Sequence, residues 1–195
     1  MTTTVPRSKF ELFKLGLGWL PHLMHGALSA KTSGAAFGKR PLMRGKICFN
    51  IKGEAIFGDN LFFYARPSGL SITVEKGATL AVGDRFFMNV GTEIVAWSEI
   101  RIGNNVMLAP YASITDHNQH ETEPGAITSK GPVVIGNNVW LGRNAVITPG
   151  VSIGDGSVIG ANSVVTRDIP PNSLAAGAPA RVIRKLEIPD GWTRT

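Results

Sequence analysis

The feature that most constrains this chain is a six-residue period in its second half. Apolar residues recur there at every sixth position, at Ile135, Leu141, Ile147, Ile153, Ile159 and Val165. A period of six matches neither an α-helix, with about 3.6 residues per turn, nor an extended strand, with about two. It fits a short strand followed by a tight corner rich in Gly, Asn and Asp. The period therefore predicts a parallel β-helix, whose stacked coils bury a core that no single repeat could bury alone.

The same pattern extends upstream in shifted registers. Two further sets have members six residues apart, namely Val82, Met88 and Ile94, and Ile102, Leu108 and Ile114. The period then breaks, so we expect residues 115–134 to leave the coil as a loop. We predict an all-β fold with a β-helix of about six coils over 45–168, and short caps with some helix over 1–44 and 169–195. The Pro-Pro pair after Ile169 is expected to end the periodic strands, because proline cannot donate to a strand ladder.

The composition excludes several classes of protein. The 195 residues suffice for one domain with a sizeable core. The single cysteine, Cys48, excludes a disulfide framework and a cysteine-based metal site, and it fits a reducing cytoplasm. The net charge of +6 is spread along the chain without a long basic run, which argues against a nucleic-acid partner and for a small anionic one.

Residues 10–28 form an apolar but interrupted segment. Lys14, Pro21, His22 and His25 break it, so it is too polar for a helix that spans a membrane. We expect a short helix that either packs on the domain or lies on a membrane surface. No secretory signal is expected, and the predicted location is the cytoplasm, with the inner membrane face as a peripheral site.

The predicted loop carries two of the four histidines, His117 and His120, next to Asp116. An imidazole can take a proton from a hydroxyl or an amine, and a neighbouring carboxylate can hold the required tautomer. The alternative is a solvated loop whose histidines have no role. A metal site of two histidines and a carboxylate matches no dedicated spacing, so no metal is expected. Nucleophilic serine catalysis has no support, because the chain lacks a GxSxG motif.

Residues 131–186 read GPVVIGNNVWLGRNAVITPGVSIGDGSVIGANSVVTRDIPPNSLAAGAPARVIRKL. This stretch resembles the hexapeptide-repeat acyltransferases, especially the galactoside and maltose O-acetyltransferases and the acetyltransferases of polysaccharide biosynthesis. The resemblance covers roughly residues 80–186. It implies a left-handed coil, which periodicity alone does not establish. It also implies a homotrimer with active sites between subunits, and acyl-CoA bound in the groove between adjacent β-helices.

The resemblance implies roles for single residues as well. A histidine in the loop after Ile114 would be the general base: His117 keeps the pairing with Asp116, while His120 lies nearer the position of the histidine in the wider family. Asn89 matches an asparagine that contacts the sugar in galactoside-type members. The residues that match the acyl-CoA site are Trp140, Gly142, Arg143, Gly160, Ala161, Thr166, Arg167, Arg181, Arg184 and Lys185.

One departure from the family pattern bears on the acceptor. Ala96 and Trp97 stand where galactoside-type members carry acidic residues. This argues against a plain galactoside or maltose acceptor. It favours a larger glycan or a glycolipid in contact with Trp97.

These observations predict an acetyl-CoA-dependent O-acetyltransferase that modifies a sugar or a glycan intermediate without a covalent enzyme intermediate. The first alternative is an N-acetyltransferase that acts on an amino sugar or an aminoglycoside-like acceptor. The second is a β-helix scaffold without enzymatic activity. A metal site of the γ-carbonic anhydrase type needs three histidines, and the repeat region offers His117 and His120 alone.

Overall fold

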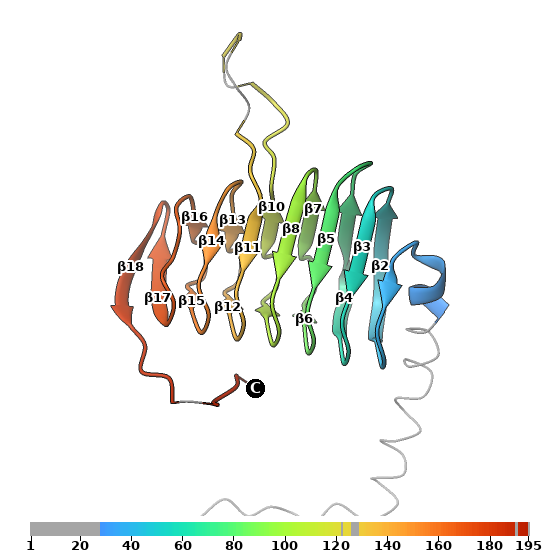
Figure 1. Cartoon of the computed structure of the whole chain (residues 1–195), viewed down its shortest axis with the longest axis horizontal. Helices are drawn as coiled ribbons and strands as arrows, with labels where there is room; N and C mark the ends of the chain where they lie inside the picture. The colour runs from blue at the N-terminus through green and yellow to red at the C-terminus, as the bar shows by residue number, and fades with distance from the viewer. Residues whose placement is uncertain (1–27, 122, 126–128, 190, 195) are drawn as a thin grey trace, which may run out of the picture.

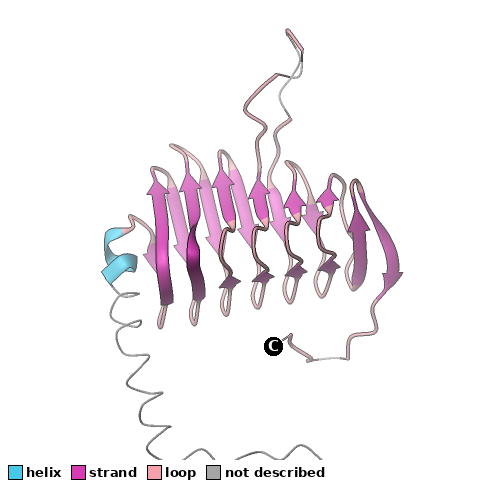
Figure 2. Cartoon of the chain, turned by 180° about the vertical axis from the view of Figure 1, so that it is seen from behind, coloured by secondary structure: helices cyan, strands magenta, loops and turns pink. Residues whose placement is uncertain are grey.

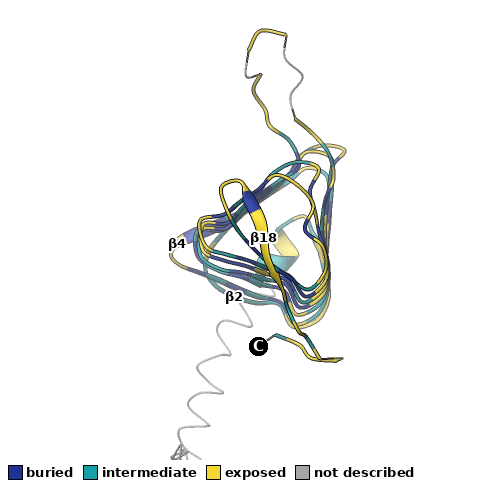
Figure 3. Cartoon of the chain, turned by 90° about the vertical axis from the view of Figure 1, so that its left-hand side faces the viewer, coloured by how far each residue is buried: buried dark blue, intermediate teal, exposed yellow. Residues whose placement is uncertain are grey.

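The computed structural model describes residues 28–121, 123–125, 129–189 and 191–194. Over these residues the chain is almost entirely β and winds as a triangular solenoid, as the end-on view of Figure 3 shows. A helical turn over residues 28–32 precedes the first strand. The apolar segment up to residue 27, with most of the predicted N-terminal cap, lies outside the described residues. No helix within the described ranges is long and apolar enough to cross a membrane.

One face of the solenoid is a parallel six-stranded sheet in the described part of the chain. Each of its strands pairs with the strand one coil further along, and Ile169 adds a level by bridging to Ile153. In spatial order the strands are β1 (Ala36–Phe37), β3 (Glu54–Phe57), β5 (Thr79–Val82), β8 (Glu99–Ile102), β11 (Val133–Ile135) and β14 (Ser152–Ile153).

The other two faces form one continuous sheet, because the long strand β4 bends around the corner between them (Figure 1). Its first residues pair with β6 and its last residues pair with β7. The strands of the face that contains β7 are β7 (Glu93–Ala96), β10 (Ser113–Thr115), β13 (Val146–Ile147) and β16 (Val164–Val165). The face that contains β6 has β6 (Phe87–Met88), β9 (Met107–Leu108), β12 (Trp140–Leu141), β15 (Val158–Ile159), β17 (Ser173–Gly177) and β18 (Ala180–Lys185). Strands β2 (Leu42–Ile51) and β4 (Phe62–Val74) cover both faces at the N-terminal end.

The core runs along the axis as columns of inward-pointing side chains. One column has a single member per coil, paired in register from strand to strand: Ile72, Ile94, Ile114, Ile147 and Val165. All five are fully buried. Branched side chains suit such pleated surfaces, and each member is packed between those above and below it. The predicted parallel β-helix of hexapeptide repeats is therefore confirmed, and its repeats are consistent with the left-handed coil that the resemblance implies.

The corner after the six-stranded sheet explains the Gly, Asn and Asp of the repeat. At each level a side-chain oxygen accepts a backbone N–H from the preceding coil, at 2.7–2.9 Å; the acceptors are Asp59, Asp84, Asn104, Asn137 and Asp155. The residue after each of these acceptors has a positive φ, a conformation that glycine and asparagine tolerate better than most other residues. A ladder of corner side chains therefore joins successive coils.

The strands extend beyond the boundaries that the sequence predicts. At the start, β1 and β2 begin before residue 45. At the end, the Pro-Pro pair after Ile169 does not stop the pairing, because β17 still pairs in parallel with β15. Pro170 and Pro171 occupy a corner between two strands, where a missing N–H costs no ladder bond.

The predicted loop projects from the solenoid between β10 and β11 (Figures 1 and 2). Because β10 ends at Thr115 and β11 begins at Val133, the excursion is slightly shorter than the predicted 115–134.

Candidate functional site

Asp116 fixes the base of the loop to the coil before it. Its side chain is fully buried, and its two carboxylate oxygens accept the backbone N–H groups of Trp97, Ser98 and Glu99 at 2.6–2.7 Å. Hydrogen bonds to a carboxylate away from water are among the stronger ones in proteins. Both oxygens are thus engaged by the backbone amides of residues 97–99, and Asp116 does not accept a hydrogen bond from the Nδ1 of His117 as the sequence led us to expect.

His117 lies directly above that corner. Its ring packs against the ring of Trp97, with centroids 5.5 Å apart and planes tilted by 34°. Its main chain is held by a bridge to Lys130 and by a hydrogen bond that the Thr115 hydroxyl donates to the His117 carbonyl. The imidazole Nδ1 is buried and has no hydrogen-bond partner among the described residues. The ring therefore has a fixed place, and its Nδ1 is engaged by no described group.

A hollow of about 540 Å³ opens beside this imidazole. It is lined by Trp97, Ser98, His117, Lys130 and Gly131. The other candidate base, His120, is exposed three residues further out on the loop and does not line the hollow. Of the two candidate bases, His117 lines this hollow and His120 does not.

Two predicted binding residues, Asn89 and Trp140, lie together on a different face. They line a second pocket of about 480 Å³ with Phe87, Met107, Ala109, Trp192 and Arg194. The Asn89 side-chain oxygen accepts the Val90 N–H at 2.8 Å, which leaves the amide nitrogen to donate. The Trp140 side chain is about 41% exposed, unusually high for an aromatic ring. This pocket and the His117 hollow share no lining residue.

The predicted acyl-CoA residues are spread along the last coils. A Cβ on Gly142 would meet the Ile159 carbonyl oxygen at 2.7 Å, and one on Gly160 would meet the Ala176 methyl group at 2.8 Å. Packing between coils thus requires glycine at both positions. The remaining candidates, Arg143, Ala161, Thr166, Arg167, Arg181, Arg184 and Lys185, are exposed. Arg143 lies over the ring of Tyr111, 5.6 Å from its centroid.

Several residues that line these hollows were not predicted from the sequence, among them Lys130, Trp192 and Arg194. Lys130 could have been found, because the chain must return to the solenoid just before the period resumes at Ile135. Trp192 and Arg194 lie in a tail without periodicity, and no sequence signal places them. The described residues contain no group of three His, Cys, Asp or Glu side chains arranged to hold a metal ion.

Known proteins share parts of this sequence and of its fold. Residues 132–167 match the family described as "Bacterial transferase hexapeptide (six repeats)". This stretch of the chain therefore carries hexapeptide repeats like those of that family. Its resemblance to the hexapeptide-repeat acyltransferases is confirmed by relatives in sequence and in structure.

The galactoside O-acetyltransferase of Escherichia coli K12 is 48% identical to this hexapeptide-repeat chain over 113 residues, which are 56% of either protein. The chain thus spans little more than half the length of the curated relatives it matches. The hexapeptide-repeat acetyltransferase VCA0836 of Vibrio cholerae superposes with a TM-score of 0.60 at 25% identity, over 93% of this chain and 95% of that one. The same protein in complex with acetyl-CoA gives a TM-score of 0.57 at 28% identity, over 83% and 76%.

Proposed function

We propose that this protein transfers an acetyl group from acetyl-CoA to a hydroxyl group of a sugar or glycan. The observation that carries the proposal is His117, a half-buried imidazole that lines a hollow and has an unpartnered nitrogen. The galactoside O-acetyltransferase of E. coli and the acetyl-CoA complex of VCA0836 support the choice of donor and reaction.

In the proposed mechanism the hydroxyl oxygen of the sugar attacks the carbonyl carbon of the thioester. At the same time His117 takes the proton from that hydroxyl group. The carbon–sulfur bond then breaks, and the imidazolium returns the proton to the leaving thiolate, so that CoA and the acetyl ester are released. Trp97 holds the imidazole ring by packing against it at a tilt, and Asp116 holds the corner that carries Trp97. Binding both substrates in one site supplies much of the rate by proximity.

The exposed cations of the last coils are suited to a donor that carries phosphates. Arg181, Arg184 and Lys185 lie on β18, and Arg167 lies on the corner after β16. Arg and Lys side chains pair with phosphate oxygens through charge-assisted hydrogen bonds. We assign these residues to the CoA phosphates, and Trp140 to the path of the donor or the acceptor.

The separation of the two hollows supports assembly as a homotrimer. The His117 hollow contains the candidate base and Trp97, whereas the predicted binding residues Asn89 and Trp140 line the other pocket. A site completed by the pocket of a neighbouring subunit would bring them together. The exposed Trp97 fits a glycan or glycolipid of polysaccharide biosynthesis, and the free thiol of Cys48 fits a reducing cytoplasm.

The test measures thiol release from acetyl-CoA with a panel of hydroxyl and amine acceptors. We expect the His117→Ala variant to lose about 100-fold to 10,000-fold in turnover, the usual contribution of a general base. His120→Ala is the matched control and should lose far less. Calorimetry should show unchanged CoA binding by both variants.

Three results would count against the proposal. Full activity of a His117→Ala, His120→Ala double variant would exclude a histidine base. Transfer to amines alone would favour an N-acetyltransferase, and the absence of any CoA-dependent thermal shift would favour a scaffold without activity.

A further inference from the structure

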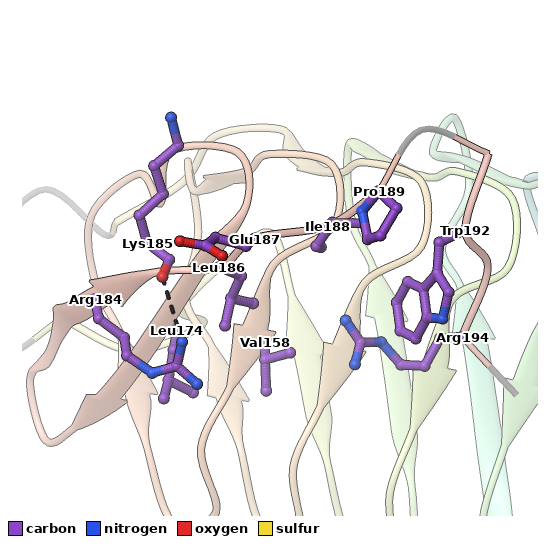
Figure 4. A pocket seen from close by; sticks show the side chains of 10 residues that line it. All are labelled: Val158, Leu174, Arg184, Lys185, Leu186, Glu187, Ile188, Pro189, Trp192 and Arg194. Carbon is purple, nitrogen blue, oxygen red and sulfur yellow. Dashed lines mark hydrogen bonds between the residues drawn. The ribbon is translucent and has the colours of Figure 1, made fainter.

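The chain ends in a segment that doubles back over the solenoid. This C-terminal strap, residues 186–189 and 191–194, follows β18 and crosses the outer face of the sheet that contains β12, β15 and β17 (Figure 4). Two asparagines hold its end. Asn138 accepts the Arg194 N–H at 2.8 Å and donates to the Trp192 carbonyl, while Asn105 donates to the Arg194 carbonyl.

Beneath the strap lies a row of outward-pointing apolar side chains. One residue from each of five neighbouring strands contributes to it, in register: Phe87, Met107, Trp140, Val158 and Leu174. The outer face of a strand is normally polar where it meets water. A continuous apolar row of this kind marks a surface that binds something.

The strap converts this row into a trough. The pocket of about 480 Å³ that contains Asn89 lies at one end, and a pocket of about 750 Å³ over Val158 and Leu174 lies at the other. Trp192 and Arg194 line both pockets, so they stand at the middle of the trough. A small sugar fits a pocket of this size, since ligand sites in proteins commonly measure about 300–1,000 Å³.

Arg194 is the cation that lines both pockets of this trough. Its guanidinium lies over the Trp192 ring, 5.0 Å from the centroid, and its Nε is buried without a hydrogen-bond partner. Among the described residues no carboxylate forms a salt bridge with it. Burial lowers the pKa of Arg194, yet arginine remains protonated in proteins. A half-buried cation without a counter-ion is costly, and an anionic ligand would relieve that cost.

We propose that Trp192 and Arg194 bind the acceptor, and that with Asn89 and Trp140 they form a subsite for a sugar that carries an anionic group. This inference rests on the proposed function, because it names the substrate class of the same reaction. The indole rings offer flat apolar surfaces to the sugar ring, and the Asn89 amide nitrogen donates to a hydroxyl oxygen. The Arg194 guanidinium offers paired N–H donors to a carboxylate or a phosphate.

The closing experiment measures direct binding to the full chain by calorimetry or saturation-transfer NMR. The probes are methyl glucoside, methyl glucuronide and glucose 1-phosphate. We expect one of the two anionic sugars to bind about tenfold more tightly than methyl glucoside. Preference for methyl glucuronide identifies a sugar acid as the acceptor class, and preference for glucose 1-phosphate identifies a sugar phosphate. Arg194→Gln should remove the preference and leave CoA affinity within about twofold.

A matched pair of variants separates the strap from the scaffold. Asn138→Gly removes the anchor of the strap without backbone strain, because Asn138 has a φ of 57°. Asn144→Gly changes an equivalent corner with a φ of 55°, whose side chain contacts Asn162 and not the strap. The first variant should weaken binding of the anionic sugar, and the second should not.

Two outcomes would overturn the inference. One is equal binding of the three sugars to the unmodified protein. The other is an Arg194→Gln variant that loses CoA affinity instead, which would assign Arg194 to the donor. These binding readouts do not depend on turnover, so they remain decisive even if acetyl transfer is absent and the proposed function fails.

Discussion

The loop that carries His117 and the C-terminal strap both interrupt a repetitive scaffold, yet they are attached to it in different ways. The loop is anchored by a fully buried carboxylate, Asp116, which accepts three backbone N–H groups. The strap is anchored by the neutral amide side chains of Asn105, which is buried, and Asn138, which is half-buried. Hydrogen bonds to an ionised acceptor are roughly twice as strong as those between neutral groups.

This difference matches what each segment is proposed to do. A base that moves a proton must stay within hydrogen-bond reach of its substrate, so its support has to be rigid. A wall of a binding site can yield when a ligand enters or leaves. The comparison therefore predicts that the anchor of the loop contributes more to stability than the anchor of the strap.

The largest effect is expected for Asp116→Asn. The new amide nitrogen would face a backbone N–H, so we expect the free energy of unfolding to fall by about 3 kcal/mol, with loss of acetyl transfer. Urea denaturation measures the first change and thiol release the second. Asp155→Asn is the control, since Asn104 and Asn137 already serve at equivalent corners, and it should cost less than about 0.5 kcal/mol. If Asp116→Asn and Asp155→Asn lowered the free energy of unfolding equally, Asp116 would be no stronger an anchor than an ordinary corner residue.

A smaller effect is expected for the double variant Asn105→Gly, Asn138→Gly. Both residues have positive φ values, so glycine keeps the backbone conformation while the contacts to the strap are lost. We expect a cost of about 1–2 kcal/mol in urea denaturation. Faster amide hydrogen exchange of the strap, with unchanged exchange in β12 and β15, would show that it detaches alone. Loss of protection throughout the solenoid would contradict a separately attached strap.

The smallest effect on stability is expected for Trp97→Leu. The side chain is about 39% exposed and packs on the His117 ring, so its loss should cost less than about 1 kcal/mol. Turnover should nevertheless fall several-fold, because the imidazole loses the surface that orients it. A variant with lower stability and unchanged turnover would show that Trp97 supports the coil rather than the base.

Much of the scaffold could be predicted from the sequence because its core repeats. The column from Ile94 to Val165 follows directly from the six-residue period, and so does the break after Ile114. The first coils were harder to delimit, because Phe37, Phe57 and Phe63 fill a wide apolar end where the period is weak. In the candidate site, the sequence singled out Trp97 and Asp116 but not the contact between them, because that contact joins two successive coils. The strap was not predictable, because no periodicity relates Arg194 to Asn105 or Asn138.

The way in which the loop is attached bears on how its sequence and length can change during evolution. Its two ends leave and rejoin the solenoid side by side, joined by the bridge between His117 and Lys130, while the strands on either side keep their partners in neighbouring coils. The entropy of closing such a loop grows only slowly with its length. Residues beyond that bridge can therefore be exchanged, lengthened or shortened while His117 and the scaffold stay in place. If the proposed function holds, new acceptors are accessible to this fold by small steps, none of which needs to disturb the coil below.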